Sequence, residues 1–539
     1  MTICLSALVS LCFANHHFVS PSGNASWSNS TSISTPCSTA VAFVNAAAGD
    51  TVFFRGGTYG TPQNNGSCQS YCGYYNVSNS GTSGNPIVFM AYPSELPLFT
   101  GLAGGSNDQT SGSTDVYATI FGTANKSYLT FDGFSFQSDA GKKMARMFIG
   151  RDHSDVTGEA TGYITLKNCL FYGGTIQNNS DDNNEGLRIE GSKFITVTNC
   201  KFTQYNNSGL NHNTGCVKMY WDTLCTINNC TFDSSTVGLY VKEAVPKTTI
   251  YNNFFRTCYI GCFIGGGIPP GLTDSLTFYN NIITNCTQQG FYWEGAGVGT
   301  GAHGNDYVIH NNTIYNSSSP GYQDALLSFT VPGHGAIFYN NIVYGGTGRN
   351  LVTDDFDGSW QNHLKQIDHN EWGVGFGTIA IGEYDRNLTY TSLASWQASN
   401  QLEVAYDAGC GSSTHPGCGD LASNPLFTNA SGKFINIVDF TIPSNSLCYS
   451  GGRNGGLIGA NAVTVGYNAT AILPPPVDPP APHDTTIINQ YDTLFTHDTV
   501  KVIVQPKYTT NVLVQTDSLD LILYTGTTTG IYRIRGISK

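Results

Sequence analysis

A repeat of about thirty residues constrains the fold of this chain more than any other feature. The signature apolar-x-Asn-x-x-apolar recurs at intervals of 23 to 31 residues, at Asn168, Asn199, Asn229, Asn252, Asn280, Asn311 and Asn340. Short alternating strands flank each copy, and Leu129–Phe136 is an earlier copy with Gly133 in the Asn position. A repeat of this length predicts a β-solenoid, because one unit cannot bury its apolar face alone but a stack of units can.

We interpret the seven Asn residues as structural rather than as ligands. Neighbouring rungs of a solenoid lie about 4.8 Å apart, the ordinary spacing of strands. Asn at the same turn of each rung can therefore pass amide hydrogen bonds along the stack. Asn also tolerates the left-handed backbone that a tight turn requires.

Composition limits the kinds of partner. Of the 539 residues only 11% are charged, and the net charge is −13. A chain with so few cations cannot release many counterions from phosphate, so nucleic acid is not expected as a partner. No apolar run reaches the roughly 18 residues of a membrane-spanning helix.

Both ends of the repeat region carry motifs. Near the start, Val19–Gly23 reads VSPSG; a helix is expected at 38–47 with Ser38 as its N-cap, and Ala48–Tyr59 reads AGDTVFFRGGTY. Near the end stand Asn424–Phe427 and Leu457–Ala460. These motifs resemble those of secreted right-handed parallel β-helix proteins of the pectate-lyase-like type. The resemblance implies an all-β fold, a right-handed parallel β-helix with an N-terminal capping helix, acting on an extracellular polysaccharide.

The chain is expected to divide into four parts. Residues 1–14 are short and apolar and read as a signal peptide, so we expect a secreted or cell-surface protein. Residues 15–472 form the β-helix with its caps, and 473–484 form a Pro-rich, stiff linker. Residues 485–539 alternate as strands and are expected to form a small β-rich module or an anchoring tail, with self-association or surface tethering as its possible roles.

An even number of cysteines, sixteen, favours disulfides in a secreted chain. Cys410 and Cys418 can close a short loop. The repeat register also places Cys258 one rung from Cys286, and it stacks Cys169, Cys200 and Cys230, so that Cys258–Cys286 and one pair among the three are candidate bridges. The alternative is that these thiols are reduced and pack as small apolar side chains.

Alternation along the strands defines two outward columns, given Leu187, Ile189, Val217, Met219, Leu239 and Val241 on the inward side. The first column is Arg188, Lys218, Tyr240, Phe263 and Tyr292. The second is Glu190, Tyr220, Lys242, Gly265 and Glu294. Three cations within three rungs form an unusual cluster in a chain so poor in charge.

This cluster predicts β-elimination on a uronic acid glycan. Arg188 can pair with the carboxylate in a bidentate way. Lys218 or Lys242, crowded by other cations, can act as the base, and the hydroxyl of Tyr220 or Tyr240 can protonate the leaving oxygen. We expect Glu190, Phe263, Tyr292 and Glu294 to contact the substrate.

Lyases that the chain resembles often use calcium, and Asp181, Asp182 and Glu185 are candidate Ca²⁺ ligands.

Hydrolysis is a competing reaction and needs two carboxyl groups about 5–9.5 Å apart. Glu190 and Glu294 lie four rungs apart, roughly 19 Å at the strand spacing, which is too far. The remaining alternative is a non-catalytic cell-surface or filament protein that binds glycan or serves only as structure.

Overall fold

A computed structural model places three parallel sheets around one core. It describes residues 15–60, 73–100, 119–137, 147–150, 161–173, 185–206, 210, 214–241, 247–265, 275–294, 306–329, 335–355, 364–381, 388–399, 417–429, 431–468, 499–500, 510–515 and 520–525. The chain divides into two compact units, Met1–Pro475 and Pro476–Lys539. No helix within these ranges is both long and apolar enough to cross a membrane.

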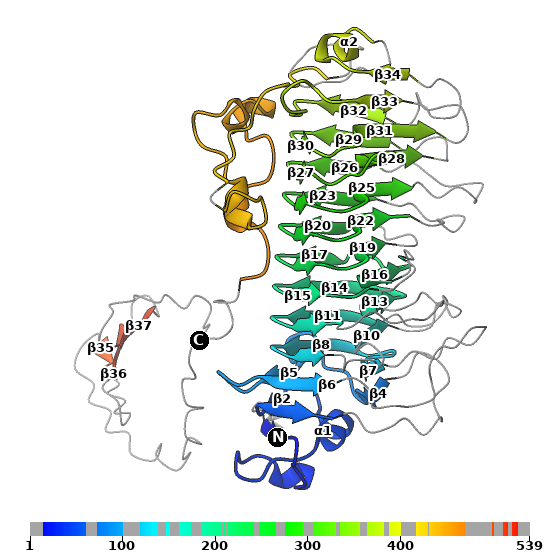
Figure 1. The fold of residues 1–539 in the computed structure, drawn as a ribbon. Helices are drawn as coiled ribbons and strands as arrows, with labels where there is room; N and C mark the ends of the chain where they lie inside the picture. The colour runs from blue at the N-terminus through cyan, green and yellow to red at the C-terminus, as the bar shows by residue number, and fades with distance from the viewer. Residues whose placement is uncertain are drawn as a thin grey trace, which may run out of the picture. The chain divides into compact units, whose positions relative to one another are not determined.

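The first unit is the predicted right-handed parallel β-helix (Figure 1). Each turn of the helix contributes one strand to each of three sheets, which we name sheet A, sheet B and sheet C. Successive strands within each sheet are parallel, except that the final pair of sheet C is antiparallel. This arrangement confirms the β-solenoid that the Asn repeat predicts.

Sheet A contains, in spatial order, β1 (His16–Val19), β2 (Thr51–Phe54), β5 (Ile87–Ala91), β8 (Ser127–Asp132), β11 (Thr161–Lys167), β14 (Ser192–Thr198), β17 (Thr226–Asn228), β20 (Thr248–Tyr251), β23 (Leu276–Tyr279), β26 (Asp306–His310), β29 (Gly335–Tyr339) and β32 (Leu364–Asp368). Sheet B contains β3 (Gly57–Tyr59), β6 (Pro97–Thr100), β9 (Ser135–Gln137), β12 (Leu170–Tyr172), β15 (Lys201–Thr203), β18 (Thr231–Asp233), β21 (Phe254–Arg256), β24 (Ile282–Thr284), β27 (Thr313–Tyr315) and β30 (Ile342–Tyr344).

Sheet C contains β4 (Gly73–Asn76), β7 (Thr119–Gly122), β10 (Met147–Gly150), β13 (Glu185–Glu190), β16 (Gly215–Tyr220), β19 (Val237–Val241), β22 (Ile260–Ile264), β25 (Gln289–Glu294), β28 (Gln323–Phe329), β31 (Arg349–Asp355), β33 (Ile379–Ile381) and β34 (Leu388–Tyr390). The short helices are η1 (Trp27–Asn29), α1 (Thr39–Asn45), α2 (Leu393–Gln397), η3 (Ile437–Phe440), η4 (Leu447–Tyr449), η5 (Arg453–Gly455) and η6 (Ala462–Thr464).

Helix α1 forms where the sequence predicts a helix. The Ser38 side chain accepts a hydrogen bond from the Val41 backbone N–H, as expected of an N-cap. Phe43 is buried and packs edge-on against Phe89 and Phe121, with ring centroids 4.7 and 4.8 Å away. The helix thus adds an aromatic side chain to the core near β2 and β5.

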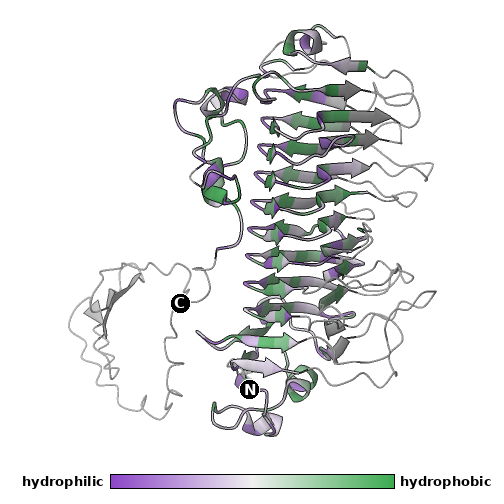
Figure 2. Ribbon diagram, viewed as in Figure 1, coloured by the Kyte–Doolittle hydropathy of each residue, from purple (hydrophilic) through white to green (hydrophobic). Residues whose placement is uncertain are grey.

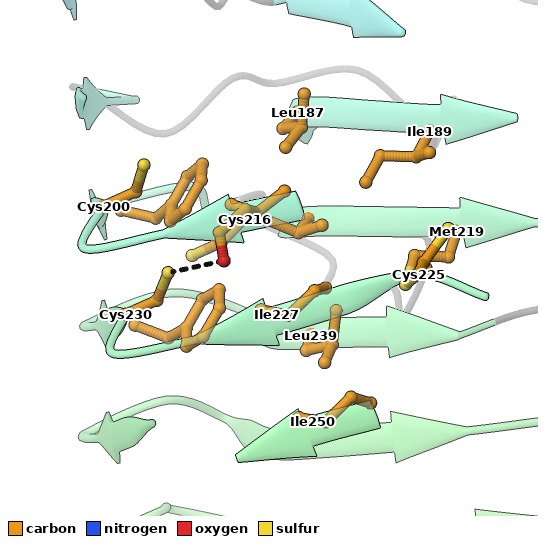
Figure 3. Close-up of a cluster of buried hydrophobic side chains, with 14 of the residues drawn as sticks. Leu187, Ile189, Cys200, Cys216, Met219, Cys225, Ile227, Cys230, Leu239 and Ile250 are labelled. Atoms are coloured by element: carbon orange, nitrogen blue, oxygen red, sulfur yellow. Dashed lines mark hydrogen bonds between the residues drawn. The ribbon is translucent and has the colours of Figure 1, made fainter. Parts of the chain in front are cut away.

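The core is the interior of the stack. Leu187, Ile189, Met219 and Leu239 are fully buried and belong to one continuous cluster, as Figure 3 shows. Hydrophobic residues recur along the stacked strands of the β-helix (Figure 2). The inward set predicted from alternation is therefore confirmed, and this fixes which side chains of sheet C point outward.

All seven repeat Asn residues adopt left-handed backbone, with φ between 50° and 58°. Their amides form only part of the predicted ladder: Asn199 donates to Asn168 (2.7 Å), Asn252 donates to Asn229 (3.3 Å), and Asn280 donates to Asn252 (2.6 Å). A deeper ladder lies one residue later in the chain, and it consists of Asn253, Asn281, Asn312, Asn341 and Asn370. These five side chains are fully buried, and the last donates from its backbone N–H to Asp420 at 2.7 Å.

Residues 453–468, which we call the strap, dock on the outward side of the same turns. The backbone N–H of Arg453 donates to the Asn340 side chain (2.9 Å), and that of Asn468 donates to Asn199 (2.7 Å). Between them, the Asn311 amide donates to Leu457 O at 2.6 Å. The strap and the segment before it cover outward residues of sheet B, burying Phe254, Ile282 and Ile342. The Asn turns therefore hold both the stack and the closing segment.

The predicted disulfides between rungs are wrong for the described cysteines. Cys258 and Cys286 are free and buried, as are Cys169, Cys200 and Cys230. In-register parallel strands hold neighbouring Cβ atoms near the strand spacing of about 4.8 Å, which is longer than the mean Cβ separation of about 3.8 Å in disulfides. The thiols instead face backbone carbonyls, such as Cys200 Sγ to Thr198 O at 3.3 Å. Cys418 is disulfide-bonded; Cys410 lies outside the described residues, so that pairing stays a prediction.

The second unit contains, among its described residues, a three-stranded antiparallel sheet of β35 (Thr499–Val500), β36 (Thr510–Gln515) and β37 (Asp520–Thr525). The predicted signal peptide, residues 1–14, and the predicted linker, residues 473–484, lie outside the described ranges.

Candidate functional site

The first outward column of sheet C is assembled as predicted. Arg188 pairs in register with Lys218 on the neighbouring strand, and Lys218 pairs with Tyr240. Phe263 and Tyr292 continue the column on β22 and β25. Five residues separated by up to 104 positions in the sequence thus become neighbours along one face.

Arg188, Lys218 and two carboxylates form a single ion cluster on this face. Arg188 Nε lies 2.6 Å from Glu190 Oε2, and Arg188 Nη1 lies 3.3 Å from Glu185 Oε1. Lys218 Nζ lies 3.9 Å from Glu185 Oε2. Two cations therefore share two carboxylates, and Glu185 is held by the longer contacts.

The cluster is buried, which sequence reasoning did not predict. Lys218, Glu185 and Glu190 are 0% exposed, and Arg188 is 4% exposed. Every residue from Glu185 to Glu190 is buried, so both faces of β13 are shielded from water. Charges interact more strongly where water is excluded, and removing one partner leaves the other uncompensated.

Aromatic rings line the rest of the face. The Arg188 guanidinium lies 4.3 Å from the centre of the Tyr220 ring, and Lys218 Nζ lies 5.8 Å from that of Tyr240. Tyr240, Phe263 and Tyr292 form a parallel stack with centroids 4.5 Å apart. The cations therefore stand at one end of an aromatic platform that extends over three further rungs.

Several predicted residues are not placed at the cluster. Lys242, Asp181 and Asp182 lie outside the described residues. Glu294 ends β25, four strands along sheet C from the β13 strand that carries Glu190. The separation that argued against a Glu190–Glu294 hydrolytic pair therefore holds.

Glu185 does not fit the predicted role of a calcium ligand. Its carboxylate faces the cations of both Arg188 and Lys218, which would repel a divalent cation. Among the described residues, no group of three or more His, Cys, Asp or Glu side chains could hold a metal ion.

Asp222 is a third buried acid near the cluster, and sequence reasoning missed it. Its carboxyl accepts hydrogen bonds from the backbone N–H of Ser192 (3.0 Å) and of Tyr220 (3.1 Å). Burial raises the pKa of Asp222 well above its usual range, and the nearby Glu190 carboxylate raises it further. An Asp directly after a strand often accepts from turn amides, and that was the available signal. Asp222 positions the end of the strand that carries Tyr220.

Comparisons with known proteins agree with this fold. A family model described as the right-handed beta helix region matches residues 125–297 and 185–359. No curated protein matches the chain.

Three solved structures illustrate the structural likeness. Pectate lyase Pel9A is 15% identical, with a TM-score of 0.46 over 85% of this chain and 98% of that one. A mannuronic acid specific polysaccharide family 6 lyase from human gut microbiota is 14% identical, with a TM-score of 0.36 over 69% and 77% of the two chains. A lacto-N-biosidase from Eubacterium ramulus is 10% identical, with a TM-score of 0.32 over 63% and 64%.

Similarities this low carry no argument about activity. The family-model match and the three parallel sheets concern the fold itself, and both cover the rungs that carry the ion cluster. The chain is a right-handed parallel β-helix protein.

Proposed function

We propose that this protein is an extracellular polysaccharide lyase that cleaves an acidic glycan by β-elimination at the Arg188–Lys218 cluster. The observation that supports it most is the placement of two cations in adjacent rungs, buried together and bordered by two tyrosines. Because only 11% of the residues are charged, two adjacent cations on one face are not expected from composition alone.

The proposed chemistry assigns one role to each side chain. Arg188 binds the carboxylate of a uronic acid, which displaces Glu185 because the Glu185 contacts are the longer ones. Lys218 removes the proton from the carbon next to that carboxylate. The electron pair forms a carbon–carbon double bond as the glycosidic C–O bond breaks, and Tyr240 or Tyr220 protonates the leaving oxygen.

Glu190 has a supporting role in this proposal. Its carboxylate lies 2.6 Å from Arg188 Nε and keeps the guanidinium turned toward the column. Phe263 and Tyr292 offer a stacked apolar platform for neighbouring sugar rings. Lys242 as an additional base, Glu294 as a substrate contact, and Ca²⁺ held by Asp181 and Asp182 stay predictions from the sequence.

The test is release of unsaturated oligosaccharides from acidic polysaccharides, followed by ultraviolet absorbance of the new double bond. Lys218→Ala should lower the rate by at least about a hundred-fold, the usual contribution of a general base. Lys193→Ala is the matched control, because Lys193 is exposed and lies on β14 of sheet A, away from the cluster strands β13 and β16 of sheet C. Equal product release by Lys218→Ala and by the wild type would refute the assignment.

A second candidate is a non-catalytic β-helix, and one observation favours it. The cations and carboxylates of the cluster already pair with one another and are almost fully buried, as in a purely structural ion network. This candidate predicts no product from any acidic polysaccharide and a loss of stability in Lys218→Ala, since the substitution removes one of the two cations that face the buried Glu185 carboxylate.

A further inference from the structure

The outer face of sheet A differs from the outer faces of the other two sheets. Along β14, β20 and β23 buried residues alternate with partly exposed ones. Sheet C buries its outward residues around the ion cluster, and the closing segment covers those of sheet B from β21 onward. Sheet A is thus the face with a long run of outward side chains still in contact with water.

Two polar columns follow this face in register. The first is Thr196, Thr226, Thr249 and Thr277, one threonine on each of four successive strands. The second, two residues further along each strand, is Thr198, Asn228, Tyr251 and Tyr279. Side chains within a column repeat at about 4.8 Å, and the columns lie about 7 Å apart along the strands.

Stacking keeps the second column ordered. The Tyr251 and Tyr279 rings stack with centroids 4.9 Å apart and planes within 5°. His310 and Tyr339 extend this stack over two more rungs, at 5.0 and 4.9 Å. Because ring faces cover one another, the side chains present their polar edges, and Asn228 Nδ2 donates to the Tyr251 hydroxyl at 2.9 Å.

Among the described residues, the members of these two columns carry no formal charge. At one end Lys167 Nζ pairs with Asp132 at 3.1 Å, and at the other end Arg453 pairs with Asp368. Burial lowers the pKa of His310, so the imidazole between them is neutral at pH 7. A charged macromolecule gains little here, whereas a ligand with regularly spaced hydroxyls meets one donor or acceptor pair per rung.

We infer that the outer face of sheet A, from Thr196–Thr198 on β14 to Tyr339 on β29, binds an extended, uncharged polysaccharide parallel to the helix axis. The repeat of such a chain, one sugar ring, is of the same order as the rung spacing, so successive sugars can meet successive rungs. Hydroxyls of the threonine column and polar edges of the ring stack supply the hydrogen bonds. This site is separate from the ion cluster of sheet C and does not depend on catalysis there.

The test is affinity electrophoresis of the full chain in gels containing xyloglucan, galactomannan or mixed-linkage β-glucan, with polygalacturonate as the anionic comparison. We expect retardation by at least one neutral glycan. The triple variant Thr226→Val, Thr249→Val, Thr277→Val keeps shape and β-propensity but removes three hydroxyls. Its affinity should fall by at least about ten-fold, because each hydroxyl contributes of the order of one hydrogen bond.

The matched control is the double variant Thr58→Val, Thr203→Val, whose threonines lie on strands β3 and β15 of sheet B and are exposed or partly exposed. It should bind as the wild type does, and so should Lys218→Ala. Tyr279→Thr is a second test variant, because it removes one ring from the stack of the second column. Circular dichroism checks that this variant still folds.

Three outcomes would overturn the inference. The wild type is retarded by none of the neutral glycans; the triple threonine variant binds them as well as the wild type; or retention is limited to polygalacturonate and is lost in Lys218→Ala, which assigns the glycan to sheet C instead. Loss of activity in Lys218→Ala with neutral-glycan binding intact keeps the two sites distinct.

Discussion

The buried Asn ladder allows a quantitative test with Asn312→Ala. Asn312 is fully buried, and its Nδ2 donates to Phe278 O and His310 O, both at 3.0 Å. It also donates to Asn341 Oδ1 at 2.9 Å. Its own Oδ1 accepts from the backbone N–H and the Nδ2 of Asn281, at 3.0 and 3.1 Å. One side chain therefore connects three rungs.

The cost of the substitution follows from the groups that lose partners. Asn281 Nδ2 loses its bond to Asn312 Oδ1 but keeps Ile250 O and Tyr279 O as acceptors, so the free energy lost at this group is small. The buried Asn281 backbone N–H loses its acceptor, which costs about 1–3 kcal/mol. The two amide N–H groups of Asn312, which share three acceptors, contribute about 1 kcal/mol each. We expect a total of about 3–5 kcal/mol, a large share of the roughly 5–15 kcal/mol that stabilises a typical fold.

The assay is urea denaturation followed by far-ultraviolet circular dichroism, with the midpoint compared between variants. The control is Asn316→Gly, which removes an exposed Asn–Asn hydrogen bond of 2.6 Å and keeps the left-handed backbone at φ 50°. It should cost less than about 1 kcal/mol. A cost for Asn312→Ala no larger than that of Asn316→Gly would refute the idea that the ladder stabilises the stack.

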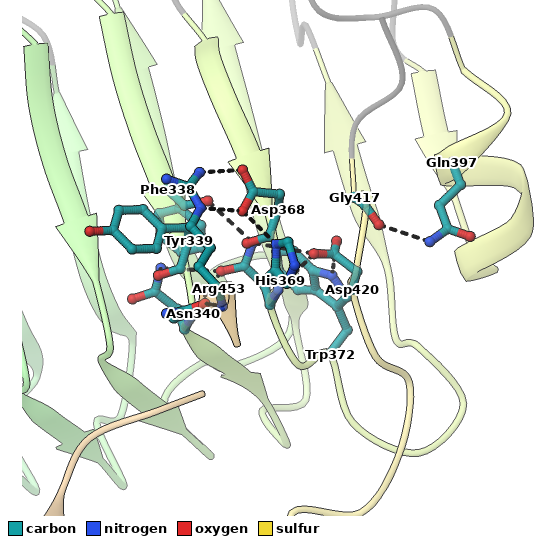
Figure 4. Close-up of polar contacts among 12 residues, drawn as sticks. Phe338, Tyr339, Asn340, Asp368, His369, Trp372, Gln397, Gly417, Asp420 and Arg453 are labelled. Atoms are coloured by element: carbon teal, nitrogen blue, oxygen red, sulfur yellow. Dashed lines mark hydrogen bonds and ion pairs between the residues drawn. The ribbon is translucent and has the colours of Figure 1, made fainter. Parts of the chain in front are cut away.

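Three further predictions concern the thiols, a buried acid and the strap. Burial raises the pKa of Cys258 well above its usual range, so iodoacetamide should modify Cys258 and Cys286 only after unfolding; labelling of the native protein, seen by mass spectrometry, would contradict this. Burial raises the pKa of Asp324 to about 6. The folded state then binds the proton more tightly than the unfolded state, so the wild type should lose stability relative to Asp324→Asn as pH rises from about 4 to 6, by about 3 kcal/mol; parallel pH curves would count against it. Arg453 pairs with the buried Asp368 (Figure 4), so Arg453→Gln should cost about 3 kcal/mol and speed protease cleavage within the strap, and unchanged cleavage would disprove the anchoring role.

The outward columns show where sequence reasoning succeeds. Strand alternation and a repeat near thirty residues were enough to place Arg188 beside Lys218, and Lys218 beside Tyr240 one rung further on. Period-two alternation and stacking leave little freedom for any other arrangement. The left-handed Asn turns followed from the same register.

Other features depend on contacts that no local pattern encodes. The inner ladder begins with the residues that follow the last four described repeat positions Asn252, Asn280, Asn311 and Asn340. Its final acceptor, Asp420, lies 50 residues after Asn370. The strap reaches Asn199 from Asn468, 269 positions away. Neither contact has a sequence signature, since hydrogen-bond partners so distant in the chain are selected only when the whole stack forms.

The amino-acid sequence by itself determined the solenoid, its rung spacing, its turn residues and the first outward column of side chains on sheet C, because these follow from short-range periodicity. The tertiary structure alone decided that Glu185 and Glu190 neutralise Arg188 and Lys218, that Cys258 and Cys286 are free thiols, and that sheet A keeps its outer face in contact with water. The physical reason is that ion pairing, thiol geometry and solvent access depend on which distant segments pack against a face, and alternation fixes only the direction in which each side chain points.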